Sequence, residues 1–77
     1  MLMKKLMSLL DAEAGKEVEI VSISAGLQAT KRLSDLGLTP KTKIKILRKA
    51  ISGPIEIELR SSKLILGRGL ASKIFIK

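Results

Sequence analysis

The side chains in this sequence with the clearest potential for acid–base chemistry or metal binding are its seven carboxylates, because it contains no histidine and no cysteine. Four of them form two pairs at i, i+2: Glu17 with Glu19, and Glu56 with Glu58. Paired acids on one strand face could bind a hard cation or share a proton. They could instead meet Lys43 and Lys45 across a sheet, where opposite charges stabilise the pairing by about 0.2–1 kcal/mol. We favour this structural role, because the sequence offers no other type of metal ligand.

The missing residue types also argue against catalysis elsewhere in the chain. Histidine is the commonest general base and the commonest transition-metal ligand, and cysteine supplies thiolates. Gly67-Arg68-Gly69 is rich in glycine, but it lacks the third glycine of a dinucleotide site and the Gly-Lys-Ser/Thr of a nucleotide-triphosphate loop. We therefore predict no catalytic residue, no metal ligand and no cofactor, and a protein that is not an enzyme.

The basic residues carry the strongest chemical signal, since the formal net charge is +8. Five cations fall within nine residues that contain no acid: Lys41, Lys43, Lys45, Arg48 and Lys49. Such an excess favours an anionic partner, which could be nucleic acid, lipid headgroups or an acidic protein surface. Single-stranded nucleic acid is usually bound by stacking on exposed aromatic rings, and Phe75 is the only aromatic residue. Nucleic acid is therefore the second choice, after a protein partner.

The length of 77 residues allows one small domain, which we place over residues 1–77. The first ten residues place Lys4 and Lys5 before a short apolar run. That run is too short for a secretory signal, and no stretch is long enough to span a membrane. We expect this segment to form a turn whose leucine and methionine side chains cap the core.

A strand followed by a helix is predicted over residues 17–36. The alternation over residues 17–23 is typical of a strand that is partly covered on both faces. Ser24 is a suitable N-cap for the helix, because its hydroxyl can accept a hydrogen bond from the first turn. Ala29, Leu33 and Leu36 recur at helical spacing, so we expect them to form the buried stripe.

The segment Leu36-Gly37-Leu38-Thr39-Pro40 is predicted to end the helix and turn the chain into a strand. Gly37 suits the position after the helix, where a left-handed conformation is needed. Leu33 and Leu38 then occupy the two positions whose apolar contact accompanies a Schellman motif. Pro40 prevents continuation of the helix and pushes Thr39 toward an extended conformation.

The remaining sequence predicts short strands near residues 43–46, 55–60, 64–66 and 74–76, with a helical turn over residues 67–72. The fold is therefore mainly β, with about five strands, one α-helix after the first strand and a short helical turn before the last. Such a chain forms either a small curled barrel or two packed sheets. We expect the last strand to lie at an exposed edge, where it could pair weakly between copies, so the protein is a monomer or a weak homo-oligomer.

The sequence resembles the FeoA family at Arg32-Leu33-Ser34-Asp35-Leu36-Gly37-Leu38-Thr39-Pro40. The resemblance continues upstream in residues 15–21 and downstream in residues 44–46, 54–57 and 64–76. It implies an SH3-like barrel and a small cytoplasmic protein of bacterial ferrous iron uptake. The sequence departs from the family pattern at Lys41, where these proteins commonly have glycine, and at Gly67 and Gly69, which replace charged helix-forming residues.

The resemblance also implies a partner, the FeoB-type ferrous iron transporter, which the protein would contact at its cytoplasmic part, at the inner face of the membrane and without inserting into it. The resemblance also implies transition-metal binding, with which the family is associated, but the lack of histidine and cysteine argues against direct metal binding by this chain. We expect the contact surface to combine apolar and cationic side chains around the helix and its following turn. The residues predicted for this surface are Leu27, Lys31, Arg32, Leu38 and Lys41. A general protein-interaction module without a link to iron is a further alternative.

Overall fold

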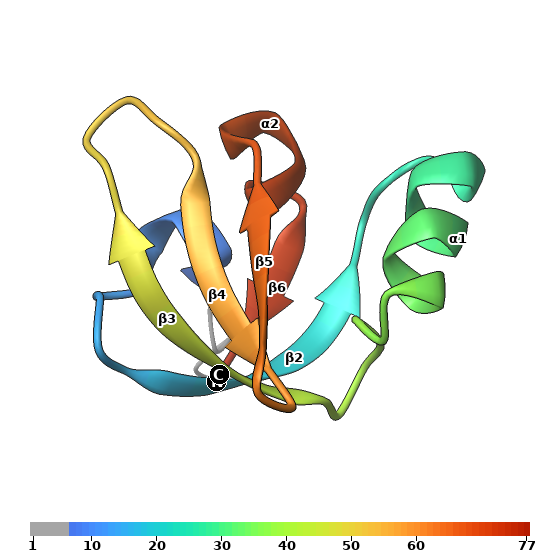
Figure 1. Ribbon diagram of the computed structural model, residues 1–77. Helices are drawn as coiled ribbons and strands as arrows, with labels where there is room; N and C mark the ends of the chain where they lie inside the picture. The colour runs from blue at the N-terminus through green and yellow to red at the C-terminus, as the bar shows by residue number, and fades with distance from the viewer. Residues whose placement is uncertain (1–6) are drawn as a thin grey trace, which may run out of the picture.

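The computed structural model describes residues 7–77, which form one six-stranded antiparallel sheet with two short helices and a single 3₁₀ turn (Figure 1). The strands are β1 (Met7–Ser8), β2 (Glu17–Ile23), β3 (Lys43–Lys49), β4 (Ile55–Leu59), β5 (Ser62–Leu66) and β6 (Ile74–Ile76). The order across the sheet is β1-β6-β2-β3-β4-β5. The mainly β fold agrees with the prediction, with one strand more than the five expected.

The additional strand lies in the N-terminal segment. In β1, Met7 pairs with Ile76 and Ser8 pairs with Phe75. The 3₁₀ turn η1 (Leu9–Asp11) follows, and its start is closed by a capping box formed by Ser8 and Asp11. A strand of two residues is too short to show an alternation of apolar and polar side chains, so the sequence did not indicate it. Leu9 is fully buried, as expected of a core-capping segment, whereas the prediction for residues 1–6 lies outside the described residues.

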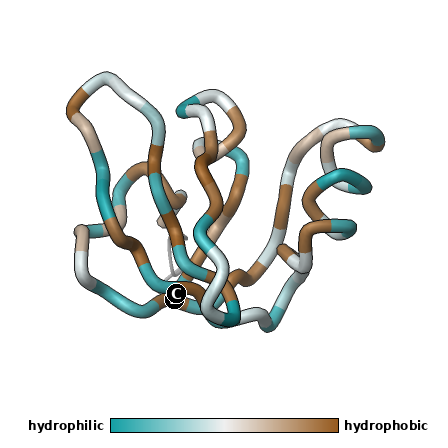
Figure 2. Tube along the Cα trace, viewed as in Figure 1, coloured by the Kyte–Doolittle hydropathy of each residue, from teal (hydrophilic) through white to brown (hydrophobic). Residues whose placement is uncertain are grey.

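The core of the described residues is built from aliphatic side chains, contributed by η1, by β2 to β6 and by both helices. Figure 2 shows hydrophobic residues recurring along the strands from which most of these side chains come. Its most deeply buried members are Leu9, Ile20, Leu33, Leu38, Ile44, Ile46, Ile55, Ile57, Ala71 and Ile74. In β3 and β4 the buried residues alternate with more exposed ones, which confirms the predicted hairpin. Lys49, at the end of β3, reaches inward: its ammonium donates hydrogen bonds to the carbonyls of Leu10 and Ala12 and so ties the η1 segment to β3.

The last strand occupies a position different from the predicted one. β6 lies between β1 and β2 rather than at an edge. Its ladder continues through Lys77, whose amide donates to the Glu19 carbonyl at 3.0 Å while the Glu19 amide donates to the Lys77 carbonyl at 3.0 Å. The expected exposed edge at residues 74–76 is therefore wrong, because the N-terminal β1 covers it. The edges of the sheet are β1 and β5.

Helix α1 (Leu27–Asp35) begins later and buries less than the sequence indicated. Its N-cap is Gly26, which provides no side-chain hydrogen bond. The predicted cap Ser24 instead donates its amide to the Lys73 carbonyl at 2.8 Å, so it belongs to the end of the sheet. Leu33 is buried as expected, but Leu36 is 51% exposed, because it follows the last helical turn and the chain there has already begun to turn away.

The junction after α1 has the predicted geometry. Gly37 has φ of +95°. The Gly37 amide donates to the Ser34 carbonyl at 2.9 Å and the Leu38 amide donates to the Leu33 carbonyl at 2.8 Å. These are the two hydrogen bonds of a Schellman motif, and the side chains of Leu33 and Leu38 are both buried, as that motif favours. The junction therefore fixes the direction in which the chain runs from the end of α1 toward β3.

Candidate protein-interaction surface

The paired carboxylates stand opposite basic residues of the neighbouring strands of the sheet. Glu17 stands opposite Lys45, and Glu19 stands opposite Lys43. On its other side, Lys45 stands opposite Glu58. This register confirms the predicted placement of the carboxylates opposite Lys43 and Lys45. Opposite charges in directly facing positions also penalise a shift by one residue, because the shift would move every charge to the apolar face.

Glu56 completes this pattern at the other end of β4. Its carboxylate accepts a hydrogen bond from the Lys63 ammonium at 2.9 Å, and this contact lowers the pKa of Glu56, with further help from the charges of Lys63 and Arg48. The lowered pKa means that the pairing is present at neutral pH and is lost only as the pH falls through the titration of this carboxyl. Across residues 7–77, no group of three or more acidic side chains has an arrangement that could hold a metal ion.

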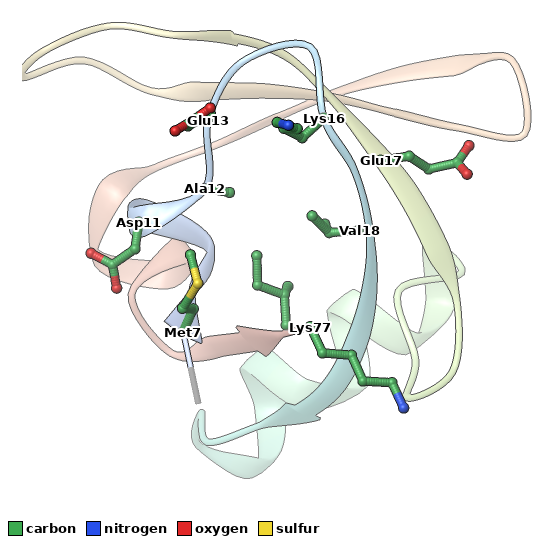
Figure 3. A pocket seen from close by; sticks show the side chains of 9 residues that line it. Met7, Asp11, Ala12, Glu13, Lys16, Glu17, Val18 and Lys77 are labelled. Carbon is green, nitrogen blue, oxygen red and sulfur yellow. The ribbon is translucent and has the colours of Figure 1, made fainter. Parts of the chain in front are cut away.

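A hollow of about 320 Å³ lies between η1, the start of β2 and the end of β6 (Figure 3). Met7, Val18 and Ile76 contribute apolar side chains to it. The acidic side chains at its rim do not converge: in Figure 3 those of Asp11, Glu13 and Glu17 point away from the centre and in different directions. This arrangement can accommodate an apolar group, but it brings no two carboxylates together for acid–base work.

Four of the five residues predicted for the contact surface are exposed or partly exposed. Leu27, the first residue of α1, is 87% exposed, and Lys31 lies one helical turn further along the same face. Arg32 is also exposed on the outer side of α1. Lys41 is exposed in the turn that follows the helix. The structure thus brings Leu27 and Lys31 together and places Lys41 beyond the opposite end of α1.

The fifth residue, Leu38, cannot form part of this surface. Its side chain is 0% exposed and belongs to the core, because the Schellman motif turns the chain inward at this point. The predicted contact set is therefore corrected to Leu27, Lys31, Arg32 and Lys41.

Besides Leu27, five large apolar side chains in residues 7–77 are exposed and were missed, and three of these are more than half exposed. Leu36 is 51% exposed beside α1, Ile65 is 62% exposed on the edge strand β5, and Ile51 is 95% exposed in the loop between β3 and β4. A signal was available for Ile51, since it sits next to the turn residues Ser52-Gly53-Pro54 and outside any alternating run.

Comparison with known proteins identifies the family. The family model described as the FeoA domain matches residues 7–77, which is the whole described part of the chain. The chain belongs to the FeoA family. It is 38% identical over 66 residues to a Methanocaldococcus jannaschii protein named as an Fe(2+) transport protein A, covering 86% of this chain and 79% of that protein.

Solved structures show that the FeoA chain has the SH3-like fold expected from the resemblance. The crystal structure of an iron uptake regulatory protein, FeoA, matches with a TM-score of 0.86 at 29% identity and covers 95% of this chain and 97% of that one. A manganese-dependent transcriptional repressor in complex with manganese matches with a TM-score of 0.85 at 19% identity, covering 97% of this chain and 37% of the repressor. The repressor therefore shares only the fold. In residues 7–77, neither helix has the length and apolar character needed to cross a bilayer.

Lys41 is one of the positions at which this chain departs from the pattern expected of the family, and the structure explains what glycine would do there. Lys41 has φ of +75°, and the Thr42 amide donates to the Thr39 carbonyl at 3.1 Å. Pro40 and Lys41 are thus the central residues of a type II turn, whose third position favours glycine. The Lys41 amide also donates to the Ile20 carbonyl at 2.7 Å, which holds the turn against β2.

We predict that Lys41→Gly raises the free energy of unfolding by about 0.5–1 kcal/mol. Removal of the side chain relieves a left-handed conformation that costs an L-residue about 1–2 kcal/mol, and part of that gain is offset by the greater freedom of glycine in the unfolded chain. Urea denaturation of both proteins measures the difference. Lys43→Gly, at an extended strand position, should be destabilising instead, and a stabilising effect at both positions would contradict this account of the turn.

Proposed function

We propose that this FeoA-family chain is a non-enzymatic accessory protein of ferrous iron uptake that acts in the cytoplasm by contacting the cytoplasmic part of a FeoB-type transporter. The observation that carries the proposal is the outer face of α1, where Leu27 is 87% exposed beside Lys31. An exposed aliphatic side chain next to cations suits a partner surface that is apolar at its centre and acidic at its rim.

The contact set proposed for this surface is Leu27, Lys31, Arg32 and Lys41. Its members come from one helix and the turn that follows it, and the Schellman motif at Gly37 holds these two segments in a fixed relation. A surface held in this way needs little reordering on binding, so less of the interaction energy is lost to the immobilisation of the backbone.

The absence of a convergent acidic group in residues 7–77 supports a role by contact rather than by iron binding. The carboxylates of the sheet are opposed by lysines, and those around the hollow point apart. Hard-cation sites need several oxygen ligands directed at one point. Tight binding of Fe²⁺ by the purified chain in equilibrium dialysis would contradict the proposal.

Calorimetric titration with the cytoplasmic domain of the cognate transporter tests the contact. Leu27→Ser should weaken binding about tenfold or more, because it removes an apolar contact from the centre of the surface. Lys31→Gln should weaken it by a smaller factor that shrinks as salt is added. The matched controls are Ile65→Ser, which removes an exposed aliphatic side chain from β5, and Lys43→Gln, which removes a cation from the sheet. Both controls should bind as the unaltered protein does.

Nucleic acid binding, the alternative function, predicts a different result when binding is titrated at low and at high salt. Binding to phosphates falls by orders of magnitude between low and high salt, whereas the apolar part of a protein contact persists. Steeply salt-dependent binding to single-stranded DNA, together with no binding to the transporter domain, would overturn the proposal.

A further inference from the structure

The two most exposed large apolar side chains in residues 7–77 lie at one end of the molecule. Ile51 is 95% exposed in the β3–β4 loop, and Leu27 is 87% exposed at the start of α1. Figure 1 shows this loop, helix α2 (Arg68–Ala71) and the N-terminal end of α1 all at the upper end of the view, with α2 between the other two. Singly exposed apolar side chains are common on protein surfaces, so what distinguishes these two is that both project at the same end of the molecule without contributing to the core.

Hydrogen bonds connect the two apolar tips through the segment that contains α2. The Arg68 guanidinium donates to the carbonyl of Ala50, the residue before Ile51, at 3.2 Å. Five residues later, the Lys73 carbonyl accepts the amide of Ser24 at 2.8 Å, just before α1. The segment from Arg68 to Lys73 thus holds the Arg68 guanidinium next to the Ile51 tip and the backbone of Lys73 against the residues that precede α1.

The three segments that form this end carry charge of one sign. The segments that form it, residues 24–31, 48–54 and 67–73, contain no aspartate and no glutamate. Their cations at the surface are Lys31, Arg48, Arg68 and Lys73, since the Lys49 ammonium is bonded to the carbonyls of Leu10 and Ala12. The acid that follows the loop in sequence is Glu56, and its carboxylate is already bonded to Lys63 at 2.9 Å. The sheet face, by contrast, alternates acids and bases.

We propose that this end, which we call the loop end (residues 24–31, 48–54 and 67–73), binds the surface of an anionic bilayer. Separate projecting tips suit a flat partner, since each can enter the headgroup region without requiring a shaped pocket. Cations within reach of anionic headgroups add an electrostatic attraction, and aliphatic tips add a shallow apolar contact. Neither contribution alone gives stable attachment, so the binding is reversible.

Fluorescence of Ile51→Trp tests the contact directly, because the chain contains no tryptophan and no tyrosine. With vesicles of phosphatidylglycerol and phosphatidylcholine, the emission of this variant should shift to the blue, and lipids brominated on their acyl chains should quench it. Vesicles of phosphatidylcholine alone should give no shift. The matched control is Ile65→Trp, on the edge strand β5, whose emission should stay unchanged with either vesicle. A probe at one site is needed because anionic vesicles also attract other cations of the chain, among them Lys4 and Lys5.

Cosedimentation gives a second readout. Ile51→Ser should reduce the fraction bound to the anionic vesicles about threefold or more, whereas Ile65→Ser should leave it unchanged. Lys73→Gln should lower it several-fold, since a cation near an anionic surface contributes about a fivefold change in affinity, and the sheet-face control Lys45→Gln should lower it less. No binding to anionic vesicles, equal shifts for both tryptophan variants, or binding of the loop end to nucleic acid or protein alone would overturn the proposal. Leu27 and Lys31 belong both to the loop end and to the proposed transporter contact set, so the variants tested here are at Ile51 and Lys73, which lie outside that set. These experiments contain no transporter, so either proposal can fail without the other.

Discussion

Gly37→Val is expected to lower the free energy of unfolding by about 2–4 kcal/mol, the larger part of what a domain of this length has available. A β-branched residue at φ of +95° is strained by its own backbone. The new Cβ would also lie 3.1 Å from Cδ2 of Leu59, a buried core residue that has little room to move. Thermal unfolding should show a fall in Tm of about 10 °C or more, given the usual change of about 4–8 °C per kcal/mol for domains of this size.

Two other glycines separate the causes of this loss. Gly15→Val carries the backbone strain without the crowding, since Gly15 has φ of +87° and nothing lies within 4 Å of its Cβ position. Gly67→Ala carries neither, because the Cβ position there is open and the conformation is ordinary. We expect losses in the order Gly37, Gly15, Gly67, with the last close to zero. An unchanged Tm for Gly37→Val would contradict the Schellman account of the junction.

Leu38→Ala is expected to destabilise the protein by about 2–5 kcal/mol, because it leaves a cavity in a fully buried part of the core. The same truncation of Leu27, 87% exposed, should change stability by less than about 0.5 kcal/mol. Chemical denaturation of the two variants therefore decides between a core role and a contact role for each leucine.

The two variants should also differ in binding. Leu27→Ala should weaken the proposed contact with the cytoplasmic domain of a FeoB-type transporter while the protein remains fully folded. Leu38→Ala, measured under conditions where it is folded, should bind with little change. A stable Leu38→Ala protein that has lost binding would show that Leu38 belongs to the contact surface rather than to the core.

The sequence predicted those features that depend on local backbone chemistry. Gly37 and Pro40 have few ways to be accommodated, so the end of the helix and the turn beyond it can be located from residue type alone. The strict alternation in β3 and β4 likewise predicted which isoleucines are buried, because the period of a strand leaves no other choice once one face is covered.

The features that sequence missed depend on tertiary contacts. Ser24 has the chemistry of a cap, but its amide is bonded to the carbonyl of Lys73, far away along the chain. Leu36 has helical spacing, yet the helix ends before it can face the core. Strand β1 exists because β6 lies beside it, and two residues carry no pattern that could reveal the pairing.

The candidate surface was predictable only in part for the same reason. Residue type indicated an apolar and cationic surface near α1, and the exposed positions of Leu27, Lys31, Arg32 and Lys41 are consistent with it. Composition alone could not distinguish an inward leucine such as Leu38 from an outward one such as Leu27. That distinction is made by two backbone hydrogen bonds at Gly37 and Leu38.

The central place of β6 has a consequence for how the chain folds during synthesis. The strand that joins β1 to β2 is made last of all the described elements, so a nascent chain on the ribosome can form the β3–β4–β5 meander but cannot complete the other half of the sheet. Until residues 74–76 emerge, the edges of β1 and β2 that pair with this strand remain without their partner. Assembly of this half therefore awaits translation of the last strand, and a ribosome stalled before that point would present an incomplete sheet to chaperones and proteases.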